Sequence, residues 1–147
     1  MAATFASRLV TPERVVVEEP VTAVMLRTDA GEATYLAGHT PLIGSVVPGL
    51  VRFEFDDGTV ERVAVHGGFV HVKADGVTVL APVAERARDI DVERARQALE
   101  AAEQSVADAA GRTGAGTDSD FAAAGELVEA QAAVRRAQVR LEVASEA

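Results

Sequence analysis

Three arginines in the last third of the chain are the residues best suited to bind a ligand. Arg94 lies near the start of one predicted helix, and Arg136 and Arg140 lie one turn apart in a second. If the two helices fold back antiparallel, the three guanidinium groups converge, and such a group is suited to a polyphosphate. The alternative is a solvated basic patch that forms ion pairs with nearby carboxylates. The candidate carboxylates are Glu85, Glu93, Glu100 and Glu142.

The three histidines offer little support for a metal site. His66 and His71 flank a Gly-Gly pair, and neither has a second ligand residue at a spacing that favours metal binding. The Gly67-Gly68 pair lacks the strand, helix and lysine of a phosphate-binding loop, and it predicts a tight strand crossing instead. His39 lies in a loop bounded by Gly and Pro, where the imidazole either meets a partner or caps the turn.

Composition restricts the classes of partner. The 147 residues include 14 Lys plus Arg against 23 Asp plus Glu, a net charge of −9, so nucleic acids and anionic lipids would repel the chain and we expect protein partners. Cysteine is absent, which excludes disulfides and thiolate sites. Apolar runs are short and no charged segment precedes one at the N-terminus. We therefore expect no signal peptide, no membrane span and no direct membrane insertion.

The segment from Thr4 to about Ala84 has the pattern of short β-strands. In 51–55 and 68–74, apolar and polar side chains alternate, as half-buried strands require. No helix-period segment interrupts this part, which indicates an all-β sandwich or flattened barrel. Turn signals of the Asp-Gly type separate the strands. They lie at 29–31, 56–58 and 75–76.

The remainder predicts two helices, at about 91–110 and 120–145, joined by a Gly-rich connector. Pro82 is expected to end the last strand, Asp89 or Asp91 to cap the first helix, and residues 118–120 to cap the second. Heptad-like spacing predicts an antiparallel hairpin with an Ala-rich seam that buries little area and can open. The seam positions are Val92, Ala95, Leu99, Ala102, Val106 and Ala109, and Leu127, Ala130, Val134, Ala137, Leu141 and Ala144.

Several segments, in this order, resemble the epsilon subunit family of F-type ATP synthases, called delta in mitochondria. The resemblance covers nearly the whole chain and implies a ten-stranded N-terminal β-sandwich in residues 1–86 and a C-terminal helical hairpin in 87–147. The matching segments are Gly31-Glu32, Gly38–Ile43, Val47–Gly49, Gly67–Val70, Val77–Ala81 and Asp89–Ala95.

The family resemblance implies a non-catalytic rotor subunit at the cytoplasmic face of the bacterial cell membrane, attached peripherally through its complex. Its partners would be the gamma subunit of the shaft, the ring of c subunits and, when the hairpin extends, the alpha/beta catalytic head. Here Ala33-Thr34 replaces the Leu-Gly usual in the family, and Ala37 replaces a Pro. The residues implied to contact partners are Glu32, His39, Thr40, Pro41 and Leu42.

Some bacterial members of this family bind ATP, so the resemblance also raises ATP as a regulatory ligand, with no cofactor required. A basic position seen in such members is Ala101 here, which is expected to weaken binding by about 1.5 to 3 kcal/mol if that contact matters. The implied ATP-binding residues are Glu85, Ile90, Asp91, Arg94, Ala95, Arg136 and Arg140.

The resulting hypothesis is a rotor subunit that couples ring rotation to the catalytic head and inhibits ATP hydrolysis when its hairpin extends. A second class is a stand-alone β-sandwich binding module with a coiled-coil oligomerisation tail. Such modules usually display aromatic platforms, whereas this chain has no Trp and one Tyr. A small hydrolase is a third class, with less support because no Ser, His and Asp set has a familiar local context.

Overall fold

The computed structural model describes residues 3–112 and 118–146 of the chain. They form two compact units, one of Met1–Ile90 with Glu142–Ala147 and the other of Asp91–Leu141. Most of the connector expected at 111–120 lies outside the described residues, as do the side chains of Asp118 and Ser119 that were expected to help cap the second helix.

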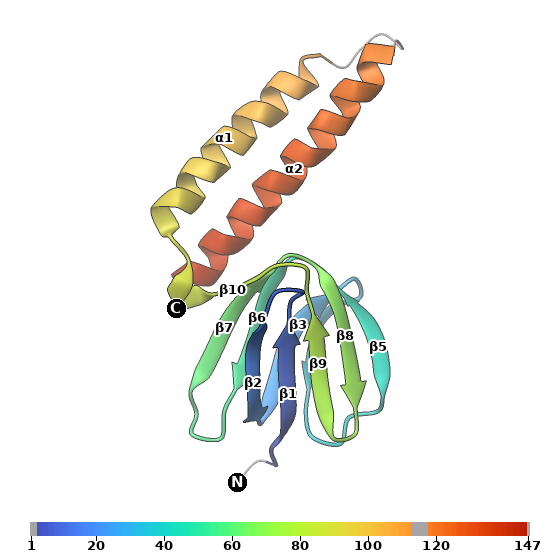
Figure 1. Ribbon diagram of the computed structural model, residues 1–147, viewed down its shortest axis with the longest axis vertical. Coiled ribbons are helices and arrows are strands. Elements are labelled where there is room, and N and C mark those ends of the chain that lie inside the picture. Colours follow the sequence, from blue (N-terminus) through green and yellow to red (C-terminus); the bar gives the residue numbers. More distant parts are fainter. Residues whose placement is uncertain (1–2, 113–117, 147) are drawn as a thin grey trace. The chain divides into compact units, whose positions relative to one another are not determined.

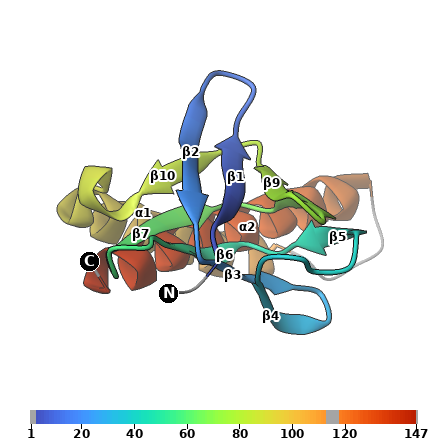
Figure 2. The same cartoon turned by 90° about the horizontal axis from the view of Figure 1, so that it is seen from below.

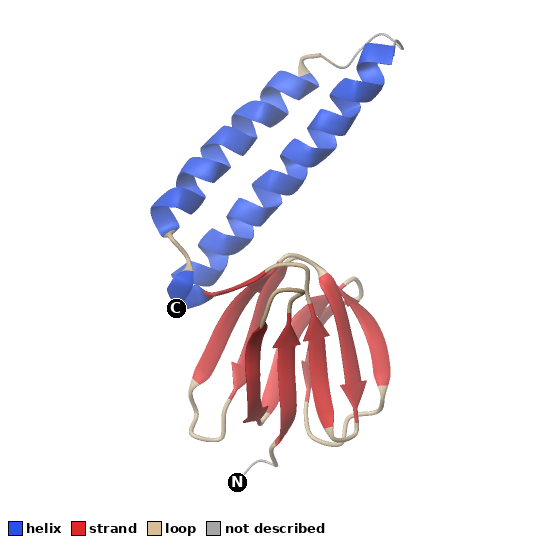
Figure 3. Ribbon diagram, viewed as in Figure 1, coloured by secondary structure: helices blue, strands red, loops and turns tan. Residues whose placement is uncertain are grey.

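The first unit contains ten β-strands, which confirms the expected mainly-β architecture (Figure 3). All three expected turns are confirmed, because they join β3 to β4, β6 to β7 and β8 to β9. The strands are β1 (Phe5–Val10), β2 (Val15–Val21), β3 (Ala23–Thr28), β4 (Gly31–Tyr35), β5 (Leu42–Val46), β6 (Gly49–Glu54), β7 (Val60–Val65), β8 (Gly68–Lys73), β9 (Gly76–Leu80) and β10 (Ala84–Arg86).

The strands form one sheet that curls around a shared interior (Figures 1 and 2). Its order is β10-β7-β6-β3-β5-β8-β9-β1-β2, with β4 paired to β3. Neighbours are antiparallel except β1 and β9, which are parallel. The two end strands of this path meet where the Arg86 guanidinium donates a hydrogen bond to the Val16 carbonyl oxygen.

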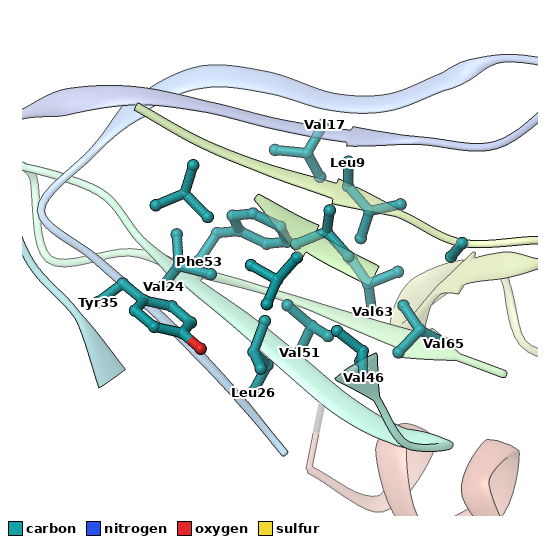
Figure 4. Packing of buried hydrophobic residues seen from close by; sticks show 14 of the residues in the cluster. Leu9, Val17, Val24, Leu26, Tyr35, Val46, Val51, Phe53, Val63 and Val65 are labelled. Carbon is teal, nitrogen blue, oxygen red and sulfur yellow. The ribbon is translucent and has the colours of Figure 1, made fainter. Parts of the chain in front are cut away.

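The interior is filled by the inward-facing side chains of this sheet (Figure 4). In β6, Val51 and Phe53 are fully buried while Arg52 and Glu54 are half-buried, which confirms the alternation predicted for this segment. In β8, Val70 and Val72 face the interior and Phe69 faces out. Apolar burial of this kind stabilises the unit without any cross-link.

Gly68 begins β8 in a conformation and a space that only glycine fits. Its φ is +131°, and a Cβ atom there would lie 2.0 Å from the Leu80 carbonyl oxygen. The tight crossing predicted for the Gly67-Gly68 pair is therefore confirmed.

The expectation that Pro82 ends the last strand is wrong. β9 ends at Leu80, and the chain then forms β10, which pairs with β7 through three residues. A 3₁₀ helix, η1 (Ala87–Asp89), follows β10. Such a short strand has too few residues for an alternation signal, so its existence depends on pairing with a distant segment.

The second unit contains the whole of α1 (Val92–Ala110) and most of α2 (Asp118–Ser145). The two helices run antiparallel (Figure 1). The Asp91 side chain caps α1 by accepting a hydrogen bond of 3.0 Å from the Arg94 backbone N–H. Buried alanines recur every seven residues in both helices, as the seam prediction required. They are Ala95, Ala102 and Ala109 in α1 and Ala123, Ala130 and Ala137 in α2, of which Ala123 lies one heptad before the predicted seam positions.

Two details of the seam prediction are wrong. Val92 is exposed, because it is the first residue of α1. Val139 and Val143 are fully buried although the repeat did not include them. Val139 lies two residues beyond Ala137 and hence on another side of the helix, so burial along α2 is not confined to one stripe.

Candidate partner-binding surface and anion site

Glu32 lies on an exposed β-hairpin in the first unit. It stands opposite Arg27 in the β3–β4 register, and Arg27 Nη2 is 3.3 Å from Glu32 Oε1. The Glu32 side chain is 81% exposed. An ion pair exposed to this degree stabilises the fold little, so the Glu32 carboxylate is accessible to a partner.

The loop that follows β4 holds His39 against its own turn. The His39 ring nitrogen Nδ1 is 2.7 Å from the Thr40 carbonyl oxygen. The imidazole also packs edge-to-face against the Tyr35 ring, with 5.1 Å between the two ring centroids. Thr40 and Pro41 are exposed, and Leu42 is half-buried at the start of β5. His39 itself is half-buried, so it packs on the turn and still presents part of its ring to solvent.

An apolar row crosses three neighbouring strands, β8, β9 and β1, on the outside of the first unit, and β5 flanks it. Register pairs Ser45 with Phe69, Phe69 with Leu80, and Leu80 with Val10, so these side chains share one face. Phe69 is 57% exposed and Leu80 48%. Ile43, two residues from Ser45 along β5, is 74% exposed on the same face.

A shallow groove continues this apolar row. Apolar side chains predominate among its lining residues, which come from the end of β1, the start of β8 and the end of β9. A continuous exposed apolar surface of this kind is typical of a protein interaction site. The lining residues are Val10, Thr11, Pro12, Gly68, Phe69, Leu80, Ala81 and Pro82.

The residues at the start of α1 divide into structural and accessible groups. Ile90 and Ala95 are buried, and the Asp91 carboxylate is engaged as the helix cap. Arg94 is exposed. The Arg94 guanidinium is therefore accessible to a ligand.

Arg136 forms an ion pair that the sequence patterns did not indicate. Its Nη2 lies 2.7 Å from Glu129 Oε1, two turns earlier in α2. Arg140, one turn further on, is half-buried and has an interaction partner of its own. The carboxylate that contacts Arg136 is therefore none of the four proposed from the sequence.

Glu85 lies in the first unit and contacts a buried histidine. Its Oε1 is 3.3 Å from His66 Nε2, and the His66 side chain is only 4% exposed. Of the residues expected to bind ATP, Glu85 and Ile90 belong to the first unit, and the other five belong to the second.

A hollow lies between the C-terminal half of α1 and the N-terminal half of α2. Its walls are small and acidic side chains, and its one basic group, Arg112, forms an ion pair of 2.5 Å with Glu126. Negative side chains make this part of the hairpin unfavourable for phosphate. The lining residues are Ala102, Ser105, Asp108, Arg112, Glu126, Glu129, Ala130 and Ala133.

The described residues contain neither a candidate metal cluster nor a candidate membrane-spanning helix. Within residues 3–112 and 118–146, no group of three or more His, Cys, Asp or Glu side chains is placed to hold a metal ion. None of the described helices is both long enough and apolar enough to cross a membrane.

Sequence reasoning missed the apolar row and the Glu129 contact. Outward Phe69 was visible in the β8 alternation, but nothing along the chain shows that Leu80 and Val10 lie beside it. That proximity follows from the register of β1, β8 and β9. Glu129 is seven residues from Arg136, a spacing at which two turns of helix separate the backbones and only long side chains meet.

Comparison with known proteins identifies the family. Residues 4–87 match the model of the ATP synthase delta/epsilon chain β-sandwich domain. The ATP synthase epsilon chain of Halalkalibacterium halodurans is 42% identical over 136 residues, covering 92% of this chain and 93% of that relative. The ATP synthase epsilon chain of Solibacter usitatus is 38% identical over 144 residues, covering 98% of each chain.

Solved structures share the fold. A chain in the structure of the Euglena gracilis mitochondrial ATP synthase, described as OSCP, F1 and c-ring, aligns with a TM-score of 0.77 at 24% identity. That alignment covers 99% of this chain and 83% of the other. Since the matched domain spans more than half of this chain and relatives above 30% identity match nearly all of it, the chain belongs to the epsilon chain family of ATP synthases.

Proposed function

We propose that this chain is a non-catalytic central-stalk subunit of a proton-translocating ATP synthase, which couples rotation of the c ring to the catalytic head. The single observation that carries this proposal is the exposed apolar row of Phe69, Leu80 and Ile43 on the first unit. An apolar row of this kind loses its contact with water when a partner covers it. The gamma subunit of the shaft is the partner we assign to this surface.

The second proposed contact is with the ring of c subunits. It uses Glu32 and the loop from His39 to Leu42, which together present charged, polar and proline side chains. Two structural relatives support this assignment, since one is described as containing a c-ring and the other as central stalk and c-ring. The chain would then sit peripherally at the cytoplasmic face of the bacterial cell membrane, held there by its complex.

The hairpin has the proposed regulatory role. Its seam buries alanines, which contribute little apolar area each, so a folded and an extended state need differ by only a few kcal/mol. Extended helices would reach the alpha/beta catalytic head and inhibit ATP hydrolysis, and folded helices would leave the head free.

ATP is the proposed regulatory ligand of the hairpin, and no cofactor is required. Arg94 is exposed, and Arg136 and Arg140 share one side of α2. The antiparallel course of the helices brings the first turn of α1 toward this part of α2, which would gather three guanidinium groups around a phosphate chain.

Deletion of residues 88–147 tests the regulatory role. Complexes assembled with the shortened chain are expected to retain the shaft contact and to hydrolyse ATP faster than complexes with the full chain. Unchanged hydrolysis in an assembled complex would contradict the inhibitory role. Failure of the shortened chain to assemble would instead make the hairpin a structural part of the complex.

A further inference from the structure

We propose that Glu129 is an internal counter-ion that a polyphosphate must displace from Arg136, and that Glu129 therefore sets the nucleotide affinity of the hairpin. This inference rests on the nucleotide-binding role proposed above. Its geometric basis is the 2.7 Å ion pair between Arg136 Nη2 and Glu129 Oε1.

The exposure of the two side chains makes displacement feasible. The Glu129 side chain is 72% exposed and that of Arg136 38%, so solvent screens the pair and both groups rehydrate readily when it opens. A buried pair would resist a competing ligand much more strongly. The contact is thus weak enough to yield to a phosphate and close enough to compete with it.

Acidic residues leave no better position for the phosphate chain further along the hairpin. The hollow beyond Glu129 is lined by Asp108 and Glu126 as well, and its one arginine, Arg112, is already paired with Glu126. A polyphosphate would be repelled there. Within the described part of the hairpin, the phosphate chain therefore has to use the Arg136 end of α2.

The Glu129 carboxylate and a phosphate compete for the same guanidinium group of Arg136. A carboxylate that neutralises Arg136 then lowers affinity twice, because it occupies N–H donors and because it repels the phosphate charge.

Glu126 provides a matched control for Glu129. Both are glutamates on α2 that pair with an arginine, and both line the same hollow. E129Q and E126Q change the net charge equally, but only E129Q releases Arg136. A general charge effect would therefore strengthen ATP binding equally in both variants.

The test is a calorimetric titration of the full-length chain with Mg-ATP, comparing the parent, E129Q, E126Q, R136Q and the R136Q/E129Q double variant. Circular dichroism verifies that each variant keeps its helices. We expect E129Q to bind Mg-ATP about three- to tenfold more tightly and E126Q to stay within about twofold of the parent. In the R136Q background, E129Q should not increase the affinity for Mg-ATP. Adenosine, which has no phosphate, should bind E129Q and the parent with the same affinity.

The outcomes separate this inference from the role on which it rests. Saturable binding by the parent that E129Q leaves unchanged, or that E126Q strengthens equally, would overturn the role of Glu129 alone. Absence of saturable binding by every variant up to about 10 mM Mg-ATP would overturn the nucleotide-binding proposal and this inference together.

Discussion

At the scale of single residues, exposure separates the charged contacts into two kinds. Glu32 and Glu129 each form an ion pair with an arginine, and their side chains are 81% and 72% exposed, respectively. Ion pairs exposed to this degree contribute little to folding stability, so either glutamate can exchange its arginine for another partner. His66, by contrast, is almost completely buried beside Glu85. The two exposed glutamates, Glu32 and Glu129, are therefore accessible to other molecules. Glu85, by contrast, contacts the buried His66 side chain.

Tyr35 gives a pH-dependent test at the residue scale. Burial raises the pKa of its phenol above the ordinary value of 10.0, because the protein interior disfavours the phenolate. The neutral phenol thus contributes stability that is fully present below pH 10 and is lost as pH rises through the raised pKa. Since Tyr35 is the one tyrosine and the chain has no Trp, tyrosinate absorbance reports this group directly.

The alkaline titration should therefore show Tyr35 ionising above pH 10 in the folded protein and at its ordinary pKa in denaturant. The free energy of unfolding should decline over the same range. A Tyr35→Phe variant is the control, because it lacks the titrating group and keeps the ring that His39 contacts. Identical titration curves for folded and denatured protein would contradict this prediction.

At the scale of elements, the packing of the helical hairpin determines how readily it opens. The buried seam side chains nearest the hollow, Ala102 and Ala130, are small, and the hollow between the helices leaves space beside them. Small side chains bury little apolar area, and unfilled space forfeits dispersion contacts. The seam therefore gains little stabilisation from apolar burial beside this hollow.

Filling the hollow should stabilise the folded hairpin. Ala133→Leu places a larger apolar side chain at a half-buried position in the hollow lining and should stabilise the hairpin by about 0.5 to 1.5 kcal/mol. Hydrogen exchange of the α1 and α2 amides is the measurement, and slower exchange is expected. Ala124→Leu is the control, because position 124 on the same helix is exposed. Equal exchange in the two variants would exclude a specific effect of the hollow.

Local patterns predicted the elements whose form depends on nearby residues. The Asp-Gly turns, the alternation at Val51 and Phe53 and the cap at Asp91 each involve a few consecutive residues, and each was predictable. Strand β10 and the apolar row could not be predicted, since both depend on register between segments far apart in the chain. The Glu129 contact depends on the rotamers of two long side chains, which the sequence pattern does not encode.

At the scale of the whole molecule, each unit supplies one side of the proposed function. The first unit has a filled interior and an apolar outer row, which suits a permanent contact with the shaft. The second unit has a small-residue seam and exposed arginines, which suits a reversible response to ligand. Under the proposed function, this separation of properties would allow one small subunit both to join a rotor and to regulate it.

The most direct test of this account is the affinity of the full-length chain for a purified gamma-type shaft subunit. Phe69→Asp should lower that affinity at least about tenfold, because it places a charge in the centre of the apolar row, and folding should be preserved since Phe69 is 57% exposed. Phe121→Asp is the matched control, because Phe121 is 81% exposed on α2, and it should bind the shaft subunit like the parent. Tight binding by the parent that Phe69→Asp abolishes would support the proposed shaft contact, whereas equal binding by all three proteins, or none by the parent, would contradict it.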